Sequence, residues 1–569
     1  MSEPGGATQW WRARAQPRAA ADPLAEEAMV PMRDGVRLST GVYLPEPLRG
    51  RVPAILIRLP YDRLNRASFL GPIARYLGEH GYAVVTQDVR GKYSSEGEPT
   101  PFLTEADDGY DTLEWLTRQT WCSGAVGMYG DSYYGCTQWS AAASGHPALR
   151  AIVPRVTTSR IAEYFGAAVS RLSFLQWVPD VWSLAENVDL PAPTSPVIHM
   201  DDFVPVGLEH GRRMFLELLE SCRDGSITER IYPGGEPTAR LSIPALHVGG
   251  WWDLDKPWQL RDWAVVSSRA PAAAQQHLML GAIDHYDFEH RPWDLPVEDY
   301  LEDDEALERL LPRLLRAPIQ LYDRHLLGRD VPELPRVSYQ LANGLWHAAD
   351  RWPPPGAEPR ALHLARGGQA CRDAQGGRLT TAAGEPTASC TWLHDPLHPV
   401  PSLVENDWQI MGTPISEESV HAREDVATFT SEPLETALSL AGPVTAQLDF
   451  ESAAPAAHVI VTLCDVAPDG RALLLLEGVA LGPARPRRAE IEVELSDTGY
   501  RVLPGHRLRI AVCSSRFPRY LPHPGTDEDA WAATARRTTT QTLHGGRVVV
   551  TVVPNATRPD LQGERTNDR

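Results

Sequence analysis

One stretch of sequence decides the fold: Val126-Gly-Met-Tyr-Gly-Asp-Ser-Tyr-Tyr-Gly-Cys-Thr-Gln-Trp-Ser-Ala-Ala-Ala-Ser-Gly145. Its first residues are apolar, a glycine-flanked serine follows, and small residues continue to Gly145. We therefore expect a strand, a sharp turn and a helix, in that order, with the helix ending at Gly145 and Pro147. A serine at such a turn is typical of a nucleophile elbow, in which a strained backbone lifts the hydroxyl of Ser132 away from the sheet.

Two details of the turn bear on this interpretation. Gly130 is needed because a side chain there would collide with the following helix. The usual pattern is Gly-x-Ser-x-Gly, but here Tyr134 holds the second glycine position and Gly135 follows one residue later. The alternative is that Ser132 belongs to an ordinary glycine turn with no chemical role. The flanking strand and helix favour the elbow.

Buried strands and helices alternate on both sides of this stretch. A hairpin with an Asp34-Gly35 turn comes first in the chain. Short apolar runs predict strands at 52–58, 82–87, 149–154, 243–249 and 277–281. Helical patterns cover 71–80, 104–120 and 303–326. Alternating strands and helices indicate a parallel, doubly wound α/β sheet.

The pattern changes twice along the chain, which gives the expected domains. Residues 157–240 contain helical patches, Trp and Pro but no buried strand, as in a helical cap inserted over a sheet. Residues 26–156 and 241–330 would form the catalytic unit around it. From 331 to 569, short strands and Pro/Gly turns predict an all-β sandwich or jelly roll.

Composition excludes some partners and sets the expected compartment. The net charge of -20 disfavours nucleic acid and anionic membranes, and no apolar run is long enough to span a bilayer. The seven scattered cysteines include no Cys-x-x-Cys pair, and the N-terminus has no signal-peptide pattern. Reduced thiols and a cytoplasmic location are expected. The sequence leaves the oligomeric state open, a homodimer included.

A serine nucleophile needs a base and a residue that orients the base, and two loops supply candidates. In α/β-hydrolases these residues follow the serine in the order acid, then histidine, each after a strand. Gly249-Gly-Trp-Trp-Asp253-Leu-Asp255 follows one predicted strand, and Gly281-Ala-Ile-Asp-His285 follows the next. Asp253 and His285 are the first choice, but Asp255 could replace Asp253, and His290 could replace His285.

A metal site is a further alternative for the histidine loop. Asp284, His285, Asp287 and His290 are all ligand types, but no helix places them on one face, so no metal is expected. His394 and His398 also have a ligand-like spacing, and we interpret them as structural.

Several long motifs resemble the cocaine esterase-like (CocE/NonD) hydrolases, which are related to X-Pro dipeptidyl-peptidases and α-amino acid ester hydrolases. The similarity spans nearly the whole chain, and this family's elbow is Gly-x-Ser-Tyr-x-Gly, which accommodates Tyr134. The motifs are Arg58-Leu-Pro-Tyr-Asp62, Gln87-Asp-Val-Arg-Gly91, Trp121 to Gly135, Gly250-Trp-Trp-Asp253, Gly281 to His285, Tyr322-Asp-Arg-His325, His394-Asp-Pro with Pro399-Val-Pro-Ser402, and Leu503-Pro-Gly-His-Arg507.

The resemblance implies a hydrolase core, a helical cap and a C-terminal jelly roll of the galactose-binding type. It implies the triad Ser132, Asp253 and His285. It also implies an oxyanion hole made by the backbone N–H of Tyr133 and the hydroxyl of Tyr61, which would otherwise be a core aromatic. We interpret Asp88 and Arg90 as a structural ion pair.

Substrate contacts are expected from Trp252, Asp255 and Glu163. In α-amino acid ester hydrolases a carboxylate just after the triad aspartate receives the substrate ammonium, and Asp255 occupies such a place. Asp255 could equally be a solvated loop charge or a helix N-cap. Lys256 follows it, where those relatives carry another acid, and is expected to weaken its field.

The predicted function is hydrolysis of a carboxylic ester or amide of a small molecule through an acyl-enzyme, without a cofactor. An aminoacyl or X-Pro peptidase, an acylase, and an acyltransferase or cyclase with the same triad are alternatives. A non-catalytic protein with a sugar-binding jelly roll is an alternative from another class, and the triad residues argue against it.

Overall fold

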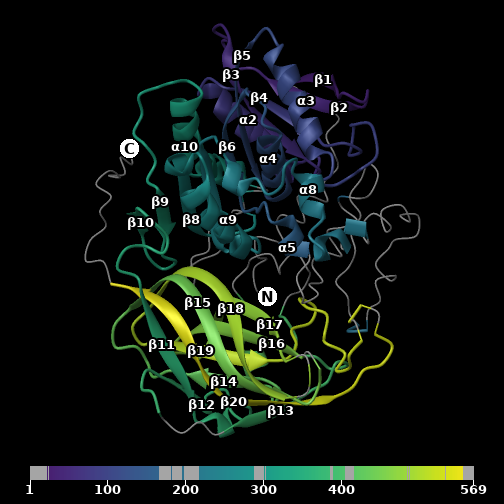
Figure 1. Ribbon diagram of the computed structural model, residues 1–569. Coiled ribbons are helices and arrows are strands. Elements are labelled where there is room, and N and C mark those ends of the chain that lie inside the picture. Colours follow the sequence, from purple (N-terminus) through teal and green to yellow (C-terminus); the bar gives the residue numbers. More distant parts are fainter. Residues whose placement is uncertain are drawn as a thin grey trace.

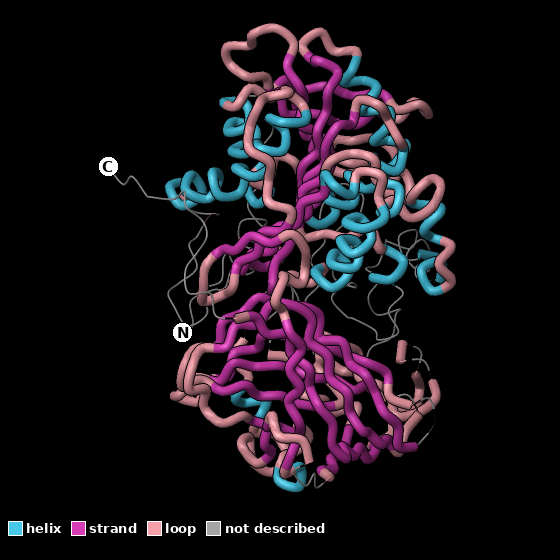
Figure 2. The backbone as a smooth tube through the Cα atoms, turned by 60° about the vertical axis from the view of Figure 1, so that its left-hand side comes forward, coloured by secondary structure: helices cyan, strands magenta, loops and turns pink. Residues whose placement is uncertain are grey.

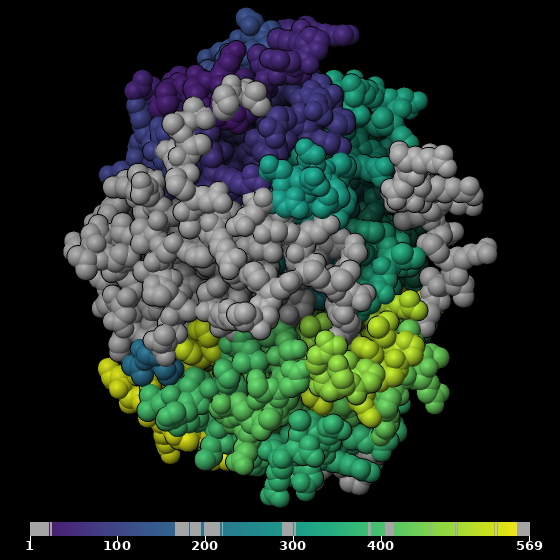
Figure 3. Space-filling model, turned by 180° about the vertical axis from the view of Figure 1, so that it is seen from behind, coloured from purple at the N-terminus to yellow at the C-terminus, as the bar shows by residue number. Residues whose placement is uncertain are grey.

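The computed structural model describes residues 25–165, 220–286, 303–384, 389–403 and 415–554, apart from five single positions in the last range, together with a few isolated residues elsewhere. Two sheets organise these residues, one in the N-terminal part and one in the C-terminal part (Figure 1). Seen from behind, the N-terminal core lies at one end of the molecule and the C-terminal residues at the other (Figure 3).

The core sheet contains ten strands in the order β1-β2-β4-β3-β5-β6-β7-β8-β9-β10. Neighbours from β4 to β9 are parallel, while β1, β2 and β10 pair antiparallel at the two edges. Its strands are β1 (Glu26–Pro31), β2 (Arg37–Tyr43), β3 (Val52–Leu59), β4 (Ala83–Asp88), β5 (Cys122–Asp131), β6 (Leu149–Arg155), β7 (Ala245–Trp252), β8 (Gln276–Asp284), β9 (Val337–Gln340) and β10 (Trp346–Ala349). The predicted hairpin and strands are confirmed.

Helices flank both faces of this sheet (Figure 2). Because side chains alternate along a strand, Ile55 and Ile57 of β3 face one helical layer and Leu56 faces the other. The first layer holds α2 (Leu70–Glu79) and α10 (Asp304–His325); the second holds α3 (Glu105–Thr117), α4 (Ser132–Ser144) and α9 (Lys256–Arg269). Short helices are η1 (Arg66–Ser68), α5 (Ile161–Phe165), α8 (Ile227–Ile231), η3 (Thr238–Arg240) and η4 (Ala273–Gln275).

Two details of the helices concern residues that often mark helix ends or breaks. Thr104 stands at the N-cap of α3 but makes no capping hydrogen bond, since its hydroxyl lies 3.0 Å from that of Thr100. Pro312 and Pro318 do not split the helix expected at 303–326, which is the single element α10.

The predicted Asp88–Arg90 ion pair is wrong. Arg90 instead pairs with Asp108 at 2.6 Å and with Asp34 at 2.7 Å. Asp88 accepts a hydrogen bond from the backbone N–H of Arg63 at 3.1 Å. Both residues therefore tie the hairpin and the loop after β3 to the core, and neither contacts the other.

The C-terminal part is an all-β domain with the strand order β17-β16-β19-β14-β12-β11-β20-β15-β18, and β13 pairs with β20. The expected boundary at 331 falls before β9, although β9 and β10 complete the core sheet. The domain's elements are β11 (Glu358–Ala365), η5 (Gly367–Gln369), β12 (Gly377–Thr380), β13 (Cys390–His394), α11 (Glu418–His421), β14 (Ala427–Thr430), β15 (Leu438–Ser452), β16 (His458–Val466), β17 (Ala472–Leu481), β18 (Arg487–Val502), β19 (Arg507–Cys513) and β20 (Thr539–Val553).

Most of the predicted cap, including nearly all of residues 166–216, lies outside the described residues. The described parts of 157–240 contain α5, α8 and η3 and no strand. Among the residues that the structure describes, no helix combines the length and the apolar character needed to cross a membrane.

Candidate active site

Ser132 stands where β5 passes directly into α4, as the sequence predicts. Its φ is +52°, a left-handed value that costs energy for a residue with a side chain. Gly130 makes the turn possible, because a Cβ there would lie 2.3 Å from Cδ2 of Tyr134 in the first turn of α4. The hydroxyl of Thr157 donates a hydrogen bond of 2.7 Å to the carbonyl of Ser132. Gly130 before the serine and the hydrogen bond of Thr157 to the serine carbonyl therefore both stabilise the corner.

His285 bridges Ser132 and Asp253. Its Nδ1 donates to Oδ1 of Asp253 at 2.6 Å, and its Nε2 lies 2.9 Å from Oγ of Ser132. Asp253 follows β7 and His285 follows β8, and these neighbouring strands are parallel, so both loops open at the carboxyl edge of the sheet. With Nδ1–H donated to the carboxylate, Nε2 can accept the proton of Ser132.

The site is buried and negatively charged around the imidazole. His285 is 6% exposed and Asp253 is 5% exposed. Burial opposes protonation of His285, but the hydrogen bond and charge of Asp253, with the charges of Asp255 and Asp284, outweigh it and raise the pKa of His285 to about 9. The surrounding carboxylates therefore favour the imidazolium form of His285.

Asp255 is also part of this cluster. It is 7% exposed, and Asp253, Asp255 and His285 each offer an atom within 4.8 Å of the others. This grouping could suggest a metal site, but both ring nitrogens of His285 already face Asp253 and Ser132. No imidazole lone pair remains for a metal ion, so the residues fit a hydrogen-bonded site better. Asp287 and His290, the other candidates from this loop, lie outside the described residues.

The two tyrosines considered for the oxyanion hole lie side by side. The half-buried ring of Tyr61, just after β3, meets the ring of Tyr133 edge-on with centroids 6.4 Å apart. The phenol of Tyr133 donates to Oε1 of Glu105 at 2.9 Å and accepts from the N–H of Phe102 at 2.8 Å. These bonds fix the residue that follows Ser132. The ring of Tyr61 therefore packs against the first turn of α4, which begins at Ser132.

A buried ion pair supports Tyr133, and no sequence pattern predicted this role. Arg58, of the Arg-Leu-Pro-Tyr-Asp motif, lies 2.8 Å from Oε2 of Glu105, and both side chains are almost fully buried. Burial raises the pKa of Glu105, while the charge of Arg58 opposes this shift. Only the contact between β3 and α3 reveals the pair, because the two residues are far apart in the chain.

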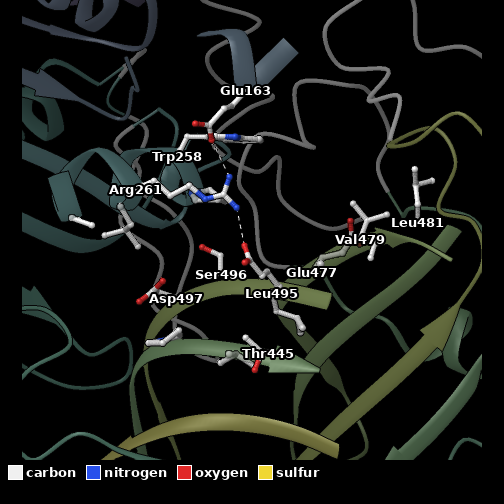
Figure 4. A pocket seen from close by; sticks show the side chains of 18 residues that line it. Glu163, Trp258, Arg261, Thr445, Glu477, Val479, Leu481, Leu495, Ser496 and Asp497 are labelled. Carbon is white, nitrogen blue, oxygen red and sulfur yellow. Dashed lines mark hydrogen bonds and ion pairs between the residues drawn. The ribbon is translucent and has the colours of Figure 1, made fainter. Parts of the chain in front are cut away.

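Of the expected substrate contacts, Glu163 forms its ion pairs with residues other than Ser132, Asp253 and His285. Its carboxylate pairs with Arg160 and, at 3.1 Å, with Arg261. Glu163 lines a cavity of about 720 Å³ between α9 and strands β15, β17 and β18, where Trp258 and Arg261 stand beside it (Figure 4). Trp252 is half-buried at the end of β7, next to Asp253.

Lys256 follows Asp255 in the chain, and its hydrogen bonds go to other residues. Its ammonium donates to the carbonyl oxygens of Trp251 and Asp497. His394 and His398 hold no common ligand position, since His394 bonds the carbonyl of His523 and His398 pairs with Asp395.

A serine on a strained strand–helix corner, bonded to a histidine on a parallel α/β sheet, defines the class of α/β serine hydrolases. Similarity to known proteins supports the same class. The family model for X-Pro dipeptidyl-peptidase (S15 family) matches residues 34–287, and the model for the X-Pro dipeptidyl-peptidase C-terminal non-catalytic domain matches residues 330–549.

Cocaine esterase from Rhodococcus sp. (strain MB1 Bresler) is 30% identical over 551 residues, which cover 87% of this chain and 92% of the esterase. The chain therefore belongs to the S15 family of serine hydrolases, and the predicted resemblance is confirmed.

Two solved structures share the fold. An aminopeptidase from a marine sediment Thaumarchaeota archaeon has a TM-score of 0.74 and 23% identity, covering 95% of this chain and 99% of its own. An α-amino acid ester hydrolase has a TM-score of 0.74 and 24% identity, covering 94% of this chain and 98% of its own.

Proposed function

We propose that the protein hydrolyses carboxylic esters of small molecules through an acyl-enzyme on Ser132. The observation that carries this proposal is the position of His285, within hydrogen-bonding distance of both Ser132 and Asp253. The similarity to cocaine esterase over most of the chain favours esters over amides.

The proposed reaction has the following steps. Oγ of Ser132 attacks the carbonyl carbon while its proton passes to Nε2 of His285. The hydroxyl of Tyr61 and the N–H of Tyr133 would bind the resulting oxyanion. The bond to the alcohol then breaks, and His285 returns the proton to the departing oxygen. Water, deprotonated by His285, cleaves the acyl-enzyme and restores the serine.

A panel of p-nitrophenyl esters, aminoacyl amides and X-Pro amides tests the proposal. Wild-type protein should cleave the esters and react with a fluorophosphonate at Ser132. Ser132→Ala should lower kcat by ~10⁴ to 10⁶, because the proposed triad acts as a unit, and should abolish the labelling. Labelling that persists in Ser132→Ala would identify another nucleophile. Acyl transfer to an added amine or alcohol in place of water would favour an acyltransferase.

Asp255 gives a specific reason to consider α-amino acyl substrates as a second candidate. A buried carboxylate close to His285 could receive a substrate ammonium. Glu163 offers little support for this, because Arg160 and Arg261 already neutralise its charge. We therefore propose that neutral acyl esters are cleaved at least as well as their α-amino counterparts, with Trp252 and Asp255 beside the acyl group.

A further inference from the structure

The loop that carries Asp253 contacts the all-β domain through the side chains of Trp251 and Lys256. Neither side chain takes part in the proposed reaction. This loop runs from Trp251, at the end of β7, to Lys256, at the start of α9. Lys256 is only 3% exposed. Its Nζ donates to the carbonyl oxygen of Trp251 at 2.8 Å and to that of Asp497 at 2.7 Å.

The ammonium of Lys256 links the two ends of the Asp253 loop. Trp251 precedes Asp253 in the chain and Lys256 follows it, so the bond to the Trp251 carbonyl joins the two ends of the segment that holds the carboxylate. A buried ammonium is costly unless its donors are used, and the two carbonyls accept from two of its three N–H groups. Burial is also the main reason that the pKa of Lys256 falls to about 8.

The second carbonyl belongs to strand β18, which is terminal in the pairing order of the described strands. The register of β18 against β15 shifts between Val444 and Thr445, and the adjoining Ser496 has a φ of +73°. A bulge of this kind bends a strand and redirects its groups. Here it lies immediately before Asp497, whose carbonyl meets Lys256.

Trp251 adds a second attachment at the same place. Its Nε1 donates to the carbonyl of Gln340 at 2.6 Å, and its ring packs so closely on Gly499 of β18 that a Cβ there would lie 2.4 Å from Cζ2. The ring also packs on Trp352, at 5.4 Å between centroids. The Nε1 of Trp352 in turn donates to Oδ1 of Asp497 at 2.8 Å. Both ends of the Asp253 loop thus rest on β18.

We propose that Lys256 is a positioning residue, which fastens the Asp253 loop to β18 so that the all-β domain holds Asp253 at hydrogen-bonding distance from His285. This inference rests on the proposed function, since it assigns Asp253 the task of orienting the base. It gives the all-β domain a role in catalysis that acts through the Asp253 loop.

A second bridge between α9 and β18 provides a matched control. Arg261 pairs with Glu494 at 2.7 Å and with Glu163 at 3.1 Å, beside Ser496 and Asp497 (Figure 4). This bridge joins the same helix to the same strand, but the side chain of Glu494 is 64% exposed and the bridge does not contact the Asp253 loop. Glu494→Gln breaks it and leaves Lys256 intact.

The test compares Lys256→Met with Glu494→Gln in the full chain, using a neutral p-nitrophenyl ester and a fluorophosphonate. A displacement of about 1 Å in a reacting group can cost about 10²-fold in rate. For Lys256→Met we expect kcat to fall ~10- to 100-fold with KM little changed, and the labelling rate of Ser132 to fall in parallel. Glu494→Gln should keep wild-type kcat and labelling rate.

Two results would overturn the inference. One is a folded Lys256→Met protein with wild-type kcat and labelling rate, whose only defect is a lower Tm. The other is an equal loss of kcat in Glu494→Gln. If Lys256→Met does not fold, Trp352→Phe takes its place, because it removes the hydrogen bond to the Asp497 carboxylate and keeps an aromatic ring, smaller than the indole, at that position. A smaller loss of kcat is expected there, and wild-type kcat would overturn the inference.

The same assays separate this inference from the proposed function. Failure of the wild-type protein to react at Ser132 would remove the proposed function and the positioning role together. Normal labelling of wild type with unchanged Lys256→Met kinetics would remove the positioning role alone.

Discussion

Replacing Asp255 by asparagine should make ester hydrolysis faster at neutral pH. The change removes one negative charge beside His285 and keeps the size of the side chain. Burial lowers the pKa of His285, but Asp253, Asp255 and Asp284 together raise it to about 9. His285 accepts the proton of Ser132 only when neutral, so the rate should rise with pH through this pKa.

The size of the effect follows from the distance between the charges. Asp255 and His285 present atoms within 4.8 Å of each other. At an effective dielectric constant of about 20, Coulomb's law gives ~3.5 kcal/mol for that separation, or ~2.5 pKa units. The asparagine amide retains part of the attraction through its dipole. We therefore expect a downward shift of ~1 to ~2.5 units, with kcat/KM rising ~10-fold or more near pH 7.

The assay is the pH profile of kcat/KM for a neutral p-nitrophenyl ester, measured from about pH 5.5 to about pH 10. In the wild type the acidic limb should lie above the ordinary imidazole value of 6.5, towards 9. In Asp255→Asn it should move to lower pH, and the alkaline plateau should fall by less than the gain near pH 7, because a less basic imidazole is a weaker general base. Glu494→Gln, which removes an exposed carboxylate, should leave the profile unchanged. A limb that stays in place in Asp255→Asn would refute this electrostatic reasoning.

Three further predictions address the base, the oxyanion hole and the acyl group. His285→Ala should be nearly as damaging to kcat as loss of Ser132, whereas His290→Ala should be mild; greater sensitivity at His290 would reassign the base. Tyr61→Phe removes one hydroxyl and should lower kcat by roughly 10²–10³ with little change in Tm, and near-normal kcat would make Tyr61 a structural aromatic. A phenylacetyl ester should have a kcat/KM at least equal to that of the phenylglycyl ester. A strong preference for the phenylglycyl ester that disappears in Asp255→Asn would favour the aminoacyl function.

The sequence by itself determined the strand–turn–helix corner at Ser132 and the alternation of strands and helices around it. These features depend on neighbouring residues: apolar runs form strands, and glycine permits the backbone of the turn. The order of the parallel strands then places the loops after β7 and β8 at one edge of the sheet. This is why Asp253 and His285 could be chosen as partners of a serine more than a hundred residues away.

Only the tertiary structure decided which charged groups meet. The sequence left Asp253 and Asp255 as alternatives, and the structure gives the hydrogen bond of His285 to Asp253. It expected Arg90 to pair with Asp88, but Arg90 contacts Asp34 and Asp108. It predicted only that Lys256 would weaken the field of Asp255, and the structure adds that Lys256 reaches the carbonyl of Asp497, 241 residues further along the chain. The spacing of residues within one segment does not predict which distant group a charged side chain will contact. Those contacts depend on how separate helices and strands pack against one another.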